Sequence, residues 1–78
     1  MLNNIPALTV EQFIKILEKG EVYCIAAKQN KAFYERRIGT KGIMDLIDVS
    51  PQEKSPAYVL HVLRQFEFTD EEIMSLFE

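Results

Sequence analysis

The side chains best suited to chemistry in this sequence are its one cysteine, Cys24, and its one histidine, His61. A thiol and an imidazole form a nucleophile pair only when the fold brings them within hydrogen-bond reach of each other. Cys24 lies in the apolar run 22–27, so we expect an inert, buried thiol. His61 falls on the polar stripe of a predicted helix, where a surface role is expected. The sequence therefore predicts no catalytic residues and a protein that is not an enzyme.

Metal-binding patterns are the next chemistry to consider. A zinc site needs about four nitrogen, sulfur or oxygen ligands, and the sequence has no CxxC, HxxxH or HExxH spacing. Asp45 and Asp48 lie three residues apart, which we interpret as solvated charge on a helix. The acidic run 70–72 is typical of a helix start, where the helix dipole favours negative charge. We predict no metal and no cofactor.

The strongest functional signal is the basic segment 28–41, which holds five bases and one acid, Glu35, for a local charge of +4. Its bases are the candidate residues for binding an anion or a partner surface: Lys28, Lys31, Arg36, Arg37 and Lys41. Gly39 and Gly42 bracket Thr40 and Lys41 at a predicted helix start, where free amides favour an anion. The spacing is not that of a P-loop. The plainer interpretation, which the pattern favours over anion binding, is that these bases only solvate the surface.

Length and composition restrict the class of protein. The chain has 78 residues, of which 47% are hydrophobic, and a net charge of -3, which predicts one globular domain spanning 1–78. Its longest apolar run has six residues, whereas a membrane helix needs about 20. The start lacks the basic and apolar regions of a signal peptide, and one cysteine forms no internal disulfide. We expect a cytoplasmic protein that does not contact membranes.

Charge is distributed unevenly along the chain. Residues 1–39 carry six bases and four acids, which gives +2, and residues 40–78 carry three bases and eight acids, which gives -5. The basic segment can therefore attract an anionic partner or pair with the acidic half of its own chain.

Three helices are predicted from their capping signals. Thr9, followed three residues later by Gln12, forms a capping-box pattern ahead of a helix over 10–19. Ser55 precedes Pro56 at the start of an apolar helix over 56–66. A second capping box, at the end of the chain, predicts a helix over 70–77.

The stretch 22–38 has two interpretations. As a β-hairpin it has strands at 22–28 and 31–38, and its predicted core face consists of Tyr23, Ile25, Ala27, Ala32, Tyr34 and Ile38. The alternative is an all-α fold with 21–38 as one helix. We favour the hairpin, because a helix would place Asn30 inside an apolar stripe. The spacing of Ile43, Leu46 and Ile47 then predicts a short helix over 41–48. The expected fold class is α+β.

These features predict a small non-enzymatic interaction module, a regulator or inhibitor that binds a protein partner. We also expect a homodimer, because a two-stranded hairpin leaves open edges. The alternative function is a nucleic-acid-binding regulator that uses the basic segment, with affinity that falls steeply with salt. Size and composition favour a bacterial or phage protein.

Overall fold

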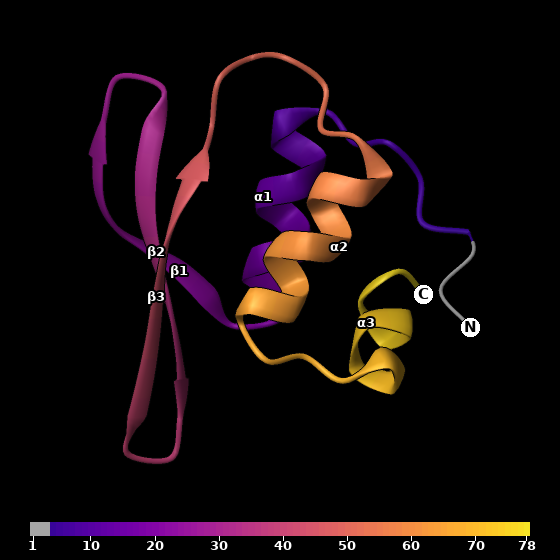
Figure 1. The fold of residues 1–78 in the computed structure, drawn as a ribbon. Helices are drawn as coiled ribbons and strands as arrows, with labels where there is room; N and C mark the ends of the chain where they lie inside the picture. The colour runs from indigo at the N-terminus through magenta and orange to yellow at the C-terminus, as the bar shows by residue number, and fades with distance from the viewer. Residues whose placement is uncertain (1–3) are drawn as a thin grey trace.

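The computed structural model describes residues 4–78, which form three helices and one three-stranded antiparallel sheet (Figure 1). The elements follow in the order α1 (Val10–Lys19), β1 (Val22–Lys28), β2 (Lys31–Ile38), β3 (Lys41–Asp48), α2 (Pro56–Gln65) and α3 (Asp70–Leu76). The sheet order is β1-β2-β3, and the helices gather on one side of it (Figure 1). The predicted α+β class is confirmed.

The capping signals predicted all three helix starts correctly. The Thr9 hydroxyl accepts a hydrogen bond from the Gln12 amide, and the Gln12 side chain accepts one from the Thr9 amide. Thr69 and Glu72 make the same reciprocal pair at the start of α3. The helix α1 has the predicted bounds, whereas α2 and α3 each end one residue earlier than expected. These helix starts are set by local side-chain chemistry, which is why the sequence predicts them well.

The predicted hairpin is confirmed, and the all-α alternative is wrong. The strands β1 and β2 pair antiparallel and have the predicted bounds. Their two-residue connection has its positive φ, 57°, at Gln29 and not at the asparagine that follows.

The predicted helix over 41–48 is wrong, because this segment is the strand β3. It pairs with β2 in an unbroken register from Lys31 opposite Asp48 to Ile38 opposite Lys41. Gly39, with φ of 61°, lies in the tight turn between the strands and does not precede a helix. Ile43 and Ile47 are four residues apart, which fits one face of a helix. The same spacing fits one face of a strand, where Ile47 is buried in the core.

A β-bulge in β1 changes which side chains enter the core. The register with β2 shifts between Cys24 and Ala26, so Ile25 is an extra residue. Tyr34 and Ala32 are buried as predicted, but Val22 is also fully buried. The prediction is wrong for the other four members of the expected core face, which are exposed: Tyr23, Ile25, Ala27 and Ile38. Cys24, expected to be buried, is exposed on this edge strand.

The hydrophobic core lies between the helices and the sheet face that is turned toward them. Its fully buried side chains are Phe13, Leu17, Val22, Ile47, Val59, Val62, Leu63, Phe66 and Ile73. A buried lysine, Lys54, fixes the connection from β3 to α2, since its Nζ donates to the Ser50 carbonyl and hydroxyl. No helix in residues 4–78 is long and apolar enough to span a membrane.

Candidate functional site

The side of the sheet turned away from the helices carries a cluster of exposed apolar side chains. We call it the outer face and define its apolar residues as Tyr23, Ile25, Ala26, Phe33, Met44 and Leu46. Residues 4–78 leave seven large apolar side chains exposed, and five of these belong to the outer face. The described helices all lie on the opposite side of the sheet (Figure 1). A contiguous apolar surface of this kind on a small protein commonly marks an interaction site.

The strand register explains how these side chains come together. Because Ala32 and Tyr34 of β2 point into the core, Phe33 between them must point outward. Phe33 lies opposite Ala26 of β1 and Leu46 of β3, which makes one row across the sheet. The neighbouring row consists of Tyr23, Glu35 and Met44. The bulge adds Ile25 to the same face, so the apolar surface is wider than a regular strand would make it.

Two shallow hollows mark the two ends of the outer face. The first, which we call the glutamate hollow, has a volume of about 200 Å³ and is lined by Glu21, Tyr23, Ile25, Glu35 and Arg37. The second, the lysine hollow, has a volume of about 150 Å³ and is lined by Ala26, Ala27, Lys28, Lys31, Phe33 and Leu46. The outer face therefore has an apolar centre with charged groups of different sign at its two ends.

The two edges of the sheet are less available than the outer face. The bulge interrupts β1, and the Cys24 thiol donates to the Ala26 carbonyl at 3.6 Å. On β3, the Asp45 carboxylate accepts from the Leu46 amide at 2.9 Å, and the Tyr58 hydroxyl accepts from the Asp48 amide at 3.0 Å. Bulges and occupied backbone groups are the usual means by which edge strands avoid pairing with another strand.

The five bases predicted as a binding site do not form one patch. Lys28 and Lys31 lie opposite each other beside the first hairpin turn. Arg36, Arg37 and Lys41 lie near the second turn, at the other end of β2. At about 3.3 Å per residue the two groups are about 20 Å apart. The predicted helix start at Gly39 is a turn between strands, so it presents no helix amides to an anion.

Arg36 is bound within the protein. Its side chain is 13% exposed and donates from Nη1 to the Phe66 carbonyl at 2.7 Å. The guanidinium carbon lies 3.7 Å from the centre of the Phe68 ring, and Nη2 lies 3.4 Å from the Glu72 carboxylate. The Thr69 amide, with Arg36 adding its positive charge, holds the pKa of Glu72 below its usual value. Arg36 therefore links the sheet to the connection between α2 and α3.

Two further bases pair with acids of the same chain. Arg37 Nη1 lies 3.6 Å from the Glu35 carboxylate on the outer face, and Lys41 Nζ lies 2.8 Å from Glu67. The basic segment is thus partly neutralised within its own protein. Arg36 and Lys41 pair with acids of residues 40–78, which is one of the two outcomes that the charge distribution predicts, whereas the acid that pairs with Arg37 lies within the basic segment.

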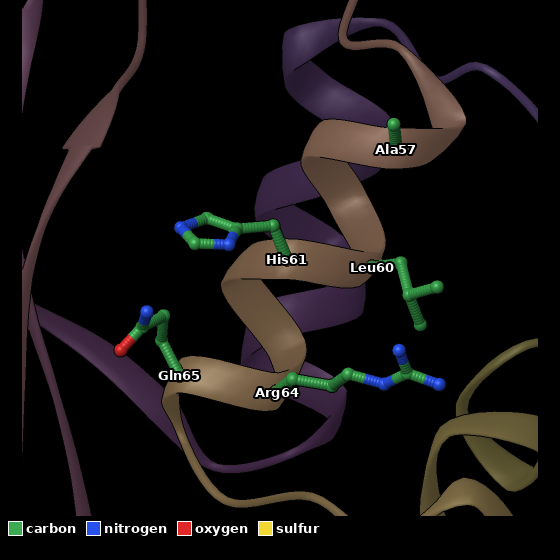
Figure 2. Close-up of a pocket in the computed structure, with 5 residues that line it drawn as sticks. All are labelled: Ala57, Leu60, His61, Arg64 and Gln65. Atoms are coloured by element: carbon green, nitrogen blue, oxygen red, sulfur yellow. The ribbon is translucent and has the colours of Figure 1, made fainter.

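His61 and Cys24 are both exposed, and the Cys24 thiol donates its hydrogen bond to the Ala26 carbonyl of its own strand. His61 lies on the polar stripe of α2, as predicted, beside a shallow hollow of about 370 Å³ that it shares with Ala57, Leu60, Arg64 and Gln65. Figure 2 shows these side chains spreading to both sides of the helix without converging on a point. In residues 4–78, no three side chains among the histidine, the cysteine and the acids could hold a metal ion.

Comparison with family models, with curated proteins and with solved structures finds no match to this chain.

The outer face is the surface that sequence reasoning missed. Its signal was present in β3, where apolar residues occur on both faces of one strand, as Ile47 and Leu46 show.

Proposed function

We propose that this protein is a small, non-enzymatic, cytoplasmic interaction module, a regulator or inhibitor that binds a protein through its outer face. The observation that carries the proposal is the clustering of five exposed large apolar side chains on that face. They are 43–56% exposed. At about 200 Å² for a large side chain, the five together expose about 500 Å². A surface of this size is at the upper end of what monomeric proteins leave open to water.

The composition of the outer face supports protein binding. Tyr23 and Phe33 supply rigid aromatic area, and Met44 supplies a flexible side chain that adapts to different partners. The charged groups of the two hollows surround this apolar centre, as the polar rim of a protein interface does.

The alternative, a nucleic-acid-binding regulator that uses residues 28–41, has weaker support. Its five bases are divided between two ends of the sheet, and Arg36, Arg37 and Lys41 are paired with acids. The net charge of -3 also opposes general binding to a polyanion. A salt-sensitive shift with DNA or RNA would favour this alternative.

Photo-crosslinking in cells tests the proposed surface directly. A photo-crosslinking residue in place of Leu46 probes the outer face, and the same residue in place of Gln65 probes the exposed stripe of α2 as a matched control. Both positions are exposed, so the fold tolerates the larger side chain. We expect covalent protein adducts from position 46 and few from position 65. Equal adducts from both positions, or none from position 46, would overturn the proposal.

A further inference from the structure

We propose that a second copy of this chain occupies the outer face, which makes the protein a two-fold symmetric dimer with its sheets packed face to face. This inference rests on the proposed function, because it names the occupant of the surface assigned there to protein binding. The two-fold axis lies between the two sheets and runs across the strands. Each strand of one copy then lies over the same strand of the other copy and runs in the opposite direction. The lysine hollow of each copy therefore faces the glutamate hollow of the other copy.

Reversal of the strands brings one pair of opposite charges together on β1. Lys28 and Lys31 occupy the row at one end, and Glu21 and Arg37 line the hollow at the other end. The reversal places Lys28 over the Glu21 of the second copy. On β2 it places Lys31 over the Arg37 of the second copy, whose charge is offset by its ion pair with Glu35. Symmetry repeats the pair on β1, so the dimer contains two equivalent contacts between Lys28 and Glu21.

The apolar side chains of β1 and β3 meet in the same orientation, whereas Phe33 on β2 lies over the Glu35 of the second copy. The row with Tyr23 and Met44 lies over the row of the second copy that contains Ala26 and Leu46. Ala26 has a small side chain, and it lines the lysine hollow of about 150 Å³. The Tyr23 ring of the second copy enters that hollow, while Met44 packs on the Leu46 of the second copy.

The available area suits a dimer of modest strength. The outer face offers about 500 Å² of apolar surface per copy, and the charged ends raise this toward the roughly 800 Å² per partner of a standard interface. Face-to-face packing needs no free strand edge. This suits the sheet, because a bulge interrupts the edge strand β1 and two backbone amides of the edge strand β3 are already hydrogen-bonded. We therefore expect a dissociation constant in the micromolar range, about 1–100 μM.

Charge reversal with mixing tests the orientation. Lys28→Glu and Glu21→Lys each replace two symmetric attractions with two repulsions, so each variant alone should dimerise about tenfold more weakly than the native protein. In an equimolar mixture, each contact joins a glutamate to a lysine again. Sedimentation equilibrium should therefore show that the mixture recovers the native dissociation constant.

Two control variants carry the same charge changes on the helical side of the molecule. Lys15→Glu on α1 and Glu71→Lys on α3 alter exposed groups away from the outer face, and we expect native dimerisation from both, alone or mixed. A native protein that stays monomeric at about 1 mM, or a mixture that fails to recover, would overturn the inference. A monomer whose position 46 still crosslinks to other proteins would overturn the dimer and leave the proposed function intact.

Discussion

At the scale of single residues, Arg36 and Arg37 show how adjacent, chemically identical side chains take different roles in one strand. Arg36 points toward the helices and is held by Phe66, Phe68 and Glu72. Arg37 points to the outer face, is 67% exposed, and has an ion pair of 3.6 Å with Glu35. The alternation of a strand separates them, so one stabilises the fold and the other is available to a partner.

This difference predicts unequal effects on stability. Arg36→Ala removes a charged hydrogen bond to a backbone carbonyl and a cation–π contact, so it should lower the free energy of unfolding by about 2 kcal/mol. Arg37→Ala removes an exposed ion pair and should change the free energy of unfolding by less than about 0.5 kcal/mol. Urea unfolding of the two variants measures both values. Equal losses would show that Arg36 does not hold the sheet to the helices.

At the scale of elements, the connection from β3 to α2 depends on a carboxylate. Asp48 Oδ1 accepts from the Ser50 amide at 2.8 Å and lies 3.5 Å from Lys54 Nζ. The hydrogen bonds from Ser50, with the charge of Lys54 adding to them, lower the pKa of Asp48 from 3.8 to about 2. The charged form of Asp48 is therefore favoured by folding.

The pH dependence of stability follows from the sign of this shift. Because the pKa of Asp48 is lower in the folded protein, its contribution is complete above the unfolded pKa of 3.8 and is lost as pH falls toward 2. Asp48→Asn should be less stable than the native protein at neutral pH, and the difference should disappear between these two pH values. Thermal unfolding across that range measures it. A difference that stays constant down to pH 2 would contradict the role of the carboxylate (pKa about 2).

The elements that the sequence predicts well are those fixed by local signals. Thr9, Ser55 and Thr69 cap helices because hydroxyls bond the free amides of a helix start. The strand β3 was missed because Ile43 and Ile47 satisfy the helical period as well as the strand period. Pairing with β2, which is not encoded within the segment, decides between them.

The candidate site was missed for a related reason. Sequence reasoning assigned function to the basic segment, because charge is visible without a fold. The outer face depends on the register, and one bulge residue, Ile25, reverses the face on which Tyr23 lies. The contacts of Arg36 join residues up to 36 positions apart, which no local pattern reveals.

At the scale of the whole molecule, the fold is asymmetric across its sheet. In residues 4–78 the three helices lie on one side of the sheet (Figure 1), and the core lies between them and the sheet. The other side exposes the apolar outer face to water. Burial of a surface of this kind is favourable at about 25 cal/mol per Å² before the costs of association are counted. Association with another protein, first of all a second copy, is the physical consequence that we propose.

Amide NMR spectra recorded on dilution of the purified protein test this central claim most directly. Between about 1 mM and 20 μM a micromolar dimer dissociates, so signals from residues at the interface should shift. The account predicts shifts at Tyr23, Phe33 and Leu46, with the signals of His61 and Gln65 on α2 unchanged. Spectra that do not change with concentration, or shifts confined to α2, would contradict it.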